Sequence, residues 1–350
     1  RDKIGRKMSK TLGNSPDPLV LIEKYGADAV RLGMLLCSSA GNDILYDEPQ
    51  IEQGRNFCNK IWNALRLIKS QKVEDIPQSN SSKLAIEWFR AKINQTLSLL
   101  EDDFSKYRLS ESLMRVYKFI WDDFCSWYLE IIKPAYQSPM DKATYEQTLD
   151  IFETLMKILH PFMPFVTEEI YHLIREREEK DFIMLAQMPE VQPFDEKLLA
   201  DFEFVQEFVA CIRAVRNEKN IPQKNTLEAF FAKTAEAEVV EKYSELITKL
   251  CNLQTLALCD QKVEKSVAKM VRTMEVFVPF ADNINKEEEI KKINEEIKYF
   301  EGFKASVEKK LANENFVNKA PQKVVDTERK KLSDCEQKLQ TLREQLAGLA

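Results

Sequence analysis

The stretch LSESLMRVYKFIWDDFCSWYLEIIKP, Leu109 to Pro134, shows most clearly how this chain folds. Its apolar residues recur every three or four positions, at 109, 113, 116, 117, 120, 121, 124, 127, 128 and 131. This spacing places them on one face of an α-helix, and Lys133-Pro134 predicts where that helix ends. A second apolar stripe, over 149–159, breaks at Pro161. Long helices with short connections are typical of a helical bundle.

The rest of the chain extends this pattern on both sides. We expect a helix over 18–37, helices through most of 50–175 with Thr167 as the N-cap of the last one, a linker over 187–194 and a helix over 198–217. Short β-like runs at 227–232, 253–258 and 274–280 surround a helix near 236–251. These residues predict a small α+β unit after the bundle.

The tail, 284–350, carries two heptad seams. One runs from Ile290 to Leu311 and the other from Val325 to Leu349, with apolar residues stepping by three and four. The segment Ala312–Pro321 between them is rich in asparagine, which favours a turn. Two matched seams joined by a turn predict an antiparallel coiled-coil hairpin, roughly 40 Å long at about 1.5 Å per residue.

The composition agrees with a mainly α fold. The 350 residues are 44% hydrophobic, enough for real cores, and contain few glycines (8) and prolines (13). The formal net charge is −6, so any contact with nucleic acid must come from a local basic patch. The hairpin offers one, because residues 304–331 hold eight Lys and Arg against four acidic residues.

Cysteine and histidine usage argues against a metal centre. The seven cysteines form no C-x-x-C pair, and the two histidines, His160 and His172, lie twelve residues apart. We expect free thiols in a reducing compartment and no metal site. No apolar run approaches the roughly 20 residues of a membrane span, and no signal peptide is visible. The expectation is a cytoplasmic protein with no membrane contact.

The loop Lys7-Met-Ser-Lys-Thr11 carries the clearest chemistry. Two lysines three positions apart, with hydroxyls at Ser9 and Thr11, suit a polyphosphate, because each ammonium is a compact charge with three donors on a long stem. A lysine pair alone is more often solvated surface. The residues that follow are more specific: Leu-Gly-Asn, Asp17-Pro18 and then Tyr25-Gly-Ala-Asp-Ala-Val-Arg31.

Together these residues resemble the second signature of class I aminoacyl-tRNA synthetases and the helix after it. The resemblance implies that Lys7, Ser9 and Lys10 hold the ATP phosphates, with Lys7 and Lys10 as the catalytic pair; Thr11 stands where the family usually has serine. ATP would enter as a substrate together with Mg²⁺, and no tightly bound cofactor is expected. Ammonium groups at this place stabilise the charge that develops when a carboxylate attacks the α-phosphorus.

Three further segments resemble valyl-tRNA synthetases in particular: GNDILYDE at 41–48, RNFCNKIWN at 55–63 and NENFVNKAP at 313–321. The resemblance implies the end of a catalytic domain over 1–50, an anticodon-binding helical bundle over 51–190, an α+β connector over 191–283 and a coiled-coil tRNA-binding arm over 284–350. The implied partners are tRNA(Val), with valine and ATP as substrates of the intact enzyme, and the expected state is a monomer. An isoleucyl-like enzyme is the alternative, although the cysteine-rich zinc segment common in that relative is absent.

Some polar side chains are candidates for contact with tRNA. They are Arg55, Asn59 and Asn63 on one helix face, Arg213 and Arg216, and Lys319 and Lys323 near the tip of the arm. A plain solvated face is an equal alternative for the first three residues.

Other conspicuous residues have a structural interpretation. Trp62, Trp121 and Trp127 lie on apolar stripes and are expected in the core. Asp28 and Arg31 fit an exposed i,i+3 ion pair as well as a functional role. The carboxylates of Asp43, Asp47 and Glu48 are expected in caps and solvated turns rather than as an acid–base pair.

The position of the lysine loop, six residues after Arg1, suggests the C-terminal part of a larger enzyme. Neither histidine lies in a His-Ile-Gly-His type signature, which in the class I family supplies the other half of the ATP site. We therefore expect this part to be inactive by itself. Two alternatives from other classes are a stand-alone tRNA-binding module and a coiled-coil protein that dimerises through 284–350.

Overall fold

The computed structural model describes residues 1–38, 43–279, 286–312, 326–329, 331–333, 335–336, 339–340 and 343. The chain divides into two compact units. The first comprises Arg1–Val263 with Ala268–Val278, and the second comprises Glu264–Val267 with Pro279–Ala350.

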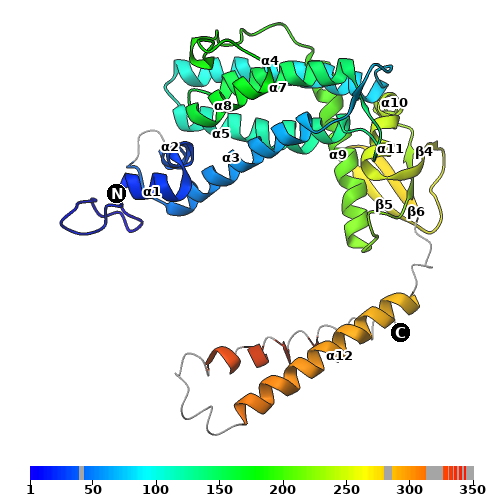
Figure 1. The fold of residues 1–350 in the computed structure, drawn as a ribbon. Helices are drawn as coiled ribbons and strands as arrows, with labels where there is room; N and C mark the ends of the chain where they lie inside the picture. The colour runs from blue at the N-terminus through cyan, green and yellow to red at the C-terminus, as the bar shows by residue number, and fades with distance from the viewer. Residues whose placement is uncertain are drawn as a thin grey trace. The chain divides into compact units, whose positions relative to one another are not determined.

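Helices make up most of the first unit (Figure 1). They are α1 (Pro18–Tyr25), α2 (Ala27–Leu36), α3 (Glu48–Lys69), α4 (Asn80–Ser105), α5 (Leu109–Lys118), α6 (Leu129–Ile132), α7 (Lys142–Leu159), α8 (Pro164–Ile174), α9 (Glu196–Glu218), α10 (Ala237–Lys242) and α11 (Ser244–Cys251), with the π-helix η1 (Phe119–Tyr128) and the 3₁₀ turn η2 (Ile183–Leu185). The expected mainly α fold is confirmed.

The helix predicted over 109–131 is present, in three consecutive parts: α5, η1 and α6. Leu113, Val116, Ile120 and Phe124 are fully buried, and the helix ends at Lys133 as predicted, whereas Leu109 is exposed. The π-helix was not predicted, because residues four apart stay close to one face in both an α-helix and a π-helix, so the apolar spacing does not distinguish the two.

Two predicted boundaries are wrong for local reasons. The helix expected over 18–37 is broken into α1 and α2 at Gly26, whose φ of 92° suits glycine. Thr167 is not an N-cap, since α8 already begins at Pro164. The Thr167 hydroxyl instead donates to the Met163 carbonyl at 2.7 Å, inside the first turns of α8.

The small α+β unit forms a four-stranded sheet in the order β4-β3-β6-β5. Its strands are β3 (Leu227–Ala232), β4 (Leu253–Cys259), β5 (Ser266–Val271) and β6 (Met274–Pro279). β3 pairs parallel with β4 and antiparallel with β6. Three of these strands were predicted and β5 was not, and the helix expected over 236–251 is the pair α10 and α11. A two-residue parallel bridge joins β1 (Val73–Glu74) to β2 (Met140–Asp141).

The second unit is built on α12 (Lys286–Leu311), drawn in orange in Figure 1. Helical turns between 326 and 343 run beside it, and their ion pairs follow an antiparallel order: Glu328 with Lys310, Glu336 with Lys304 and Arg343 with Glu301. Val307, Cys335 and Leu339 are buried in this unit. Residues 313–325, with the predicted turn, lie outside the described residues, so the complete coiled-coil hairpin stays a prediction.

Candidate functional site

The lysine loop, residues 7–11, is braced by two side chains outside it. Asn14 Oδ1 accepts a hydrogen bond from the Ser9 N–H at 2.9 Å, while Asn14 Nδ2 donates to the Lys7 carbonyl at 3.3 Å and to Asp2 Oδ2 at 3.1 Å. Asp2 also accepts from the backbone N–H of Arg6 at 2.8 Å and from its guanidinium. Desolvation raises the pKa of Asp2, but the hydrogen bonds from Asn14 and Arg6 lower it by more, to about 2. The brace therefore stays charged at neutral pH.

The two lysines project from this braced backbone. Lys7 and Lys10 are exposed, and neither ammonium forms a hydrogen bond or ion pair with any residue that the structure describes. The Ser9 hydroxyl oxygen accepts from the Leu12 N–H at 3.2 Å, which leaves the hydroxyl proton available as a donor. The structure thus brings Lys7, Ser9 and Lys10 together as a cationic loop that can bind an anion with several oxygens.

Asp28 and Arg31 connect this N-terminal segment to the bundle. The Asp28 carboxylate accepts from the backbone N–H of Phe165 at 3.3 Å and of Val166 at 2.6 Å, at the start of α8. Arg31 donates to the carbonyls of Pro161 and Phe162, both at 3.3 Å. The predicted exposed ion pair is wrong, because Asp28 is buried and each side chain binds the turn between α7 and α8. Burial raises the pKa of Asp28, and the two N–H groups oppose that shift.

The three carboxylates near the start of α3 make structural contacts. Asp43 pairs with Arg1, and Asp47 with Lys3 at 3.1 Å. Glu48 accepts from the Tyr25 hydroxyl at 2.7 Å and from Lys24 at 2.9 Å. Asp47 occupies the N-cap position of α3, as expected, although its side chain gives no cap bond. These contacts fasten the first residues of the chain and α1 to α3.

The α3 candidates share an exposed helix face. Arg55, Asn59 and Asn63 are all exposed. Arg55 lies 3.8 Å from Glu52 and 5.8 Å from the centre of the Tyr25 ring. Trp62, expected in the core, is 37% exposed on the same side, so that prediction is wrong. Trp121 and Trp127 are half-buried in η1, where Lys60 and Arg213 lie over their rings.

The arginines of α9 differ in their surroundings. Arg216 is 1% exposed, and its guanidinium donates to the carbonyls of Pro222, Asn225 and Cys251 at 2.8–2.9 Å. In this structure Arg216 joins α9 to the sheet and presents no donor to a phosphate. Arg213 is half-buried and donates to the Leu250 carbonyl at 3.2 Å. Lys319 and Lys323, the candidates on the arm, lie outside the described residues.

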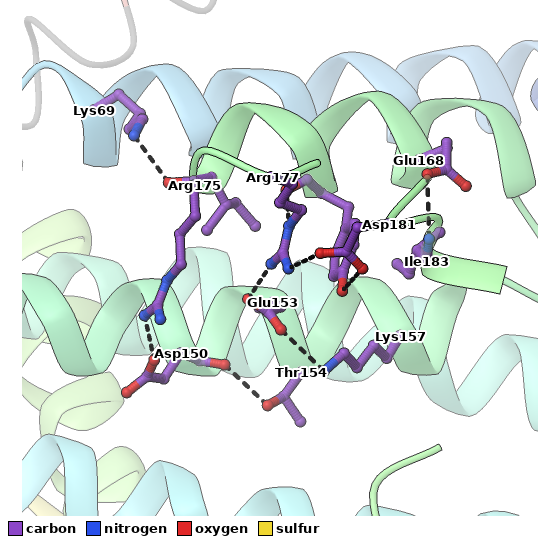
Figure 2. Close-up of polar contacts among 12 residues, drawn as sticks. Lys69, Asp150, Glu153, Thr154, Lys157, Glu168, Arg175, Arg177, Asp181 and Ile183 are labelled. Carbon is purple, nitrogen blue, oxygen red and sulfur yellow. Dashed lines mark hydrogen bonds and ion pairs between the residues drawn. The ribbon is translucent and has the colours of Figure 1, made fainter. Parts of the chain in front are cut away.

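A polar network, not singled out by the sequence, fastens the segment 175–183 to α7 and α8 (Figure 2). Arg177 donates to Glu153 at 2.6 Å and to Asp181 at 3.1 Å, and its guanidinium lies 3.4 Å from the centre of the Tyr171 ring. Lys157 approaches Glu153 to 2.9 Å. Burial raises the pKa of Glu153, but Lys157 and Arg177 outweigh it and lower that pKa. Because these groups bind one another, they hold the fold rather than a ligand.

No cluster of three or more His, Cys, Asp or Glu side chains within the described ranges has the arrangement of a metal site. All seven cysteines are free thiols. None of the described helices combines the length and apolar composition that a membrane crossing needs.

Three family models match the chain. They are tRNA synthetases class I (I, L, M and V) over residues 1–47, the anticodon-binding domain of tRNA ligase over 87–231, and the valyl tRNA synthetase tRNA binding arm over 285–350. The LeuRS–tRNA–LeuAMS complex of Agrobacterium radiobacter K84 aligns with a TM-score of 0.40 and 15% identity, over 80% of this chain and 32% of that one.

Curated relatives match the chain from end to end. It is 51% identical over 350 residues to the valine–tRNA ligase of Parabacteroides distasonis and 52% identical over 349 residues to that of Phocaeicola vulgatus. Both alignments cover 100% of this chain and 40% of the relative, so the chain spans about two fifths of their length. The valine–tRNA ligase of Fusobacterium nucleatum is 37% identical over 364 residues, 99% of this chain and 41% of the relative. The chain therefore belongs to the valine–tRNA ligase family and corresponds to a C-terminal part of its members.

Proposed function

We propose that this chain supplies the ATP-phosphate loop and the tRNA-binding surfaces of an enzyme that activates valine with ATP and esterifies it to tRNA(Val). The lysine loop carries this proposal, because two ammonium groups that have no partner among the described residues project from a backbone that Asn14 and Asp2 brace. The similarity to valine–tRNA ligases supports it. The proposed layout is the end of the catalytic domain over 1–50, the anticodon-binding bundle over 51–190, the α+β connector over 191–283 and the tRNA-binding arm over 284–350.

The loop acts through charge. When the valine carboxylate attacks the α-phosphorus of ATP, a C–O–P linkage forms and the bond to the departing pyrophosphate breaks. Negative charge then grows on the phosphoryl oxygens, and Lys7 and Lys10 stabilise it more than they stabilise bound ATP. The free proton of the Ser9 hydroxyl adds a donor to a phosphate oxygen. Mg²⁺ is expected to be held mainly by the phosphates and water, as is usual for this ion in nucleotide sites.

RNA recognition is assigned to polar residues of both units. In the first unit these are the exposed Arg55, Asn59 and Asn63 and the half-buried Arg213, and in the arm they are Lys319 and Lys323. Arg216 is not retained, because its donors are used by backbone carbonyls. We place the enzyme in the cytoplasm as a monomer, since the two seams of the tail can satisfy each other within one chain. Sedimentation of the chain as a dimer would contradict the monomer.

The test of RNA binding is a titration of the chain with tRNA(Val) and with a non-cognate tRNA at two salt concentrations. We expect tRNA(Val) to bind more tightly and the affinity to fall steeply as salt rises, because phosphate contacts release counterions. Equal, salt-independent binding of both tRNAs would contradict the proposal.

The test of catalysis is valine-dependent exchange of pyrophosphate into ATP. We expect none from this chain alone, because residues 1–50 contain one ATP signature and neither histidine belongs to the other. Addition of the preceding part of a related enzyme in trans should restore exchange, and Lys10→Ala should abolish the restored activity.

A further inference from the structure

The exposed face of α3 has an unusual composition. Glu52, Arg55, Asn59, Trp62, Arg66 and Lys69 recur every three or four residues, so they form one stripe along the helix. The opposite face is the apolar one, with Phe57, Ile61, Leu65 and Ile68 buried. Trp62 therefore lies in the middle of a polar stripe and away from the core-facing side.

The neighbours of Trp62 do not form an apolar patch. Asn59 and Arg66 lie three residues before and four residues after it, and Asn63 follows it directly. None of these three side chains has a hydrogen bond or ion pair within the described part of the chain. An indole left 37% exposed among unpaired amides and a guanidinium is a poor surface for an apolar partner.

The stripe has a positive balance. It carries three cations, Arg55, Arg66 and Lys69, and one carboxylate, Glu52, whereas the whole chain has a net charge of −6. The Arg55–Glu52 pair is loose, at 3.8 Å, and Lys69 is tied to the Ile174 carbonyl at 3.0 Å. Arg66, four residues after Trp62 on the same face of α3, has no side-chain partner among the residues described and is free for an external anion.

We propose that this stripe binds an unpaired stretch of RNA, with one base stacked on Trp62. Asn59 and Asn63 bind the edge of that base, and Arg66 binds a neighbouring phosphate. An aromatic ring, amides and a cation on one surface match the three parts of an unstacked nucleotide: base plane, base edge and phosphate. The inference rests on the proposed binding of tRNA and adds Trp62 and Arg66 to it.

Stacking and phosphate contact differ in their salt dependence, which gives the test. The full chain is titrated with tRNA(Val) over a series of salt concentrations, as wild type, Trp62→Ala, Trp62→Phe and Arg66→Ala. Trp62→Ala should weaken binding about 5- to 150-fold without changing the salt slope, and Trp62→Phe should recover most of the loss. Arg66→Ala should reduce the slope by about one. Tyr136→Ala, at an aromatic residue 92% exposed elsewhere, is the control and should change neither quantity.

Two further measurements separate stacking from a folding defect. A blunt RNA duplex, which offers no unpaired base, should bind wild type and Trp62→Ala equally. Saturating tRNA should quench more of the fluorescence of the wild type than of Trp62→Phe. The inference is overturned if the wild type binds tRNA and Trp62→Ala binds it as well. It is also overturned if Trp62→Phe is as weak as Trp62→Ala while both unfold like the wild type. Absence of tRNA binding by the wild type would instead reject the proposed function.

Discussion

Asp28 ties the segment that carries the lysine loop to the bundle through two backbone N–H groups at the start of α8. Those N–H groups have no carbonyl partner within α8, so the carboxylate acts as a cap supplied by another helix. Asp28→Asn turns an amide N–H toward one of them. We expect the free energy of unfolding to fall by about 1–2 kcal/mol at pH 7, measured by urea denaturation.

Glu23→Gln is the matched control for Asp28→Asn, because Glu23 is an exposed carboxylate on α1 and the change removes the same charge. It should leave stability within about 0.5 kcal/mol. Amide exchange should speed up at Val166 in Asp28→Asn and remain unchanged in Glu23→Gln. Equal stability and equal exchange at Val166 in both variants would show that the cap contributes nothing.

Asp123, in η1, should make stability fall as pH rises. Burial raises the pKa of its carboxyl to about 6, while Lys92 opposes the shift and Asp122 adds to it. Between the ordinary value of 3.8 and about 6 the folded chain holds a proton that the unfolded chain has lost, so stability decreases across that window. Two pH units correspond to at most about 3 kcal/mol.

Asp123→Asn should remove this dependence. We expect the variant to equal the wild type near pH 4 and to be more stable above pH 7, by urea denaturation at a series of pH values. Asp122→Asn, at the neighbouring exposed carboxylate, is the comparison: Asp123 is still present, so the fall in stability with rising pH should persist, slightly reduced because Asp122 adds to the shift. A stability difference for Asp123→Asn that is constant with pH would contradict the assignment.

Single residues also show what the sequence can and cannot predict. Pro161 and Pro164 correctly marked the break after α7. The cap of α8 was missed, and Thr167 was chosen in its place, because the true acceptor lies more than 130 residues earlier in the chain. For the same reason Arg216, expected to face RNA, is buried, and Trp62, expected in the core, is exposed. Whether a polar or aromatic side chain is buried depends on elements that local spacing does not specify.

At the scale of elements, α2 and α3 lock together through two glycines. A Cβ at Gly54 would lie 2.6 Å from the Ala29 carbonyl oxygen, and one at Gly33 would lie 2.7 Å from the Ile51 backbone. These contacts bring the helix after the lysine loop against the helix that carries the stripe around Trp62. Gly54→Ala should therefore lower the free energy of unfolding by about 1–2 kcal/mol in a denaturant titration, although alanine favours a helix.

Gly302→Ala, in α12, is the control for the helix preference alone, because a Cβ there meets nothing within 4 Å. It should stabilise α12 by about 0.5–1 kcal/mol, measured as the free energy of unfolding of its helical structure. If Gly54→Ala were as favourable as Gly302→Ala, the backbones of α2 and α3 would not be in close contact.

The elements themselves were largely predictable, and their details were not. Apolar spacing located the long helices of the bundle and three of the four strands in the larger sheet. It missed η1, since π-turns retain a similar apolar spacing, and it missed β5, whose pattern of burial is mixed. The sequence shows a glycine at position 26, but a glycine alone does not indicate whether its φ is positive, so the break between α1 and α2 was not predicted.

At the scale of the whole molecule, charge is divided unevenly along the chain. Residues 304–331 hold eight Lys and Arg against four acidic residues, while the complete chain has a net charge of −6. Some of these cations are neutralised within the second unit, as Lys304 is by Glu336 and Lys331 by Glu328, both at 2.7 Å. If the arm binds RNA, its remaining cations must account for much of the salt dependence.

The double variant Lys319→Ala with Lys323→Ala, made in the full chain, tests how much the cations of the arm contribute to the salt dependence of tRNA binding. Each lysine that contacts a phosphate contributes about 0.7 to 0.9 to the slope of log K against log salt, so the double variant should lower that slope by about one to two. The slope is measured by titration with tRNA(Val) at several salt concentrations. Lys83→Ala with Lys142→Ala removes the same charge from exposed positions at the starts of α4 and α7 and is the control. An equal loss of slope in both double variants would mean that the arm acts only through net charge, and an unchanged slope in both would place residues 319 and 323 away from the RNA.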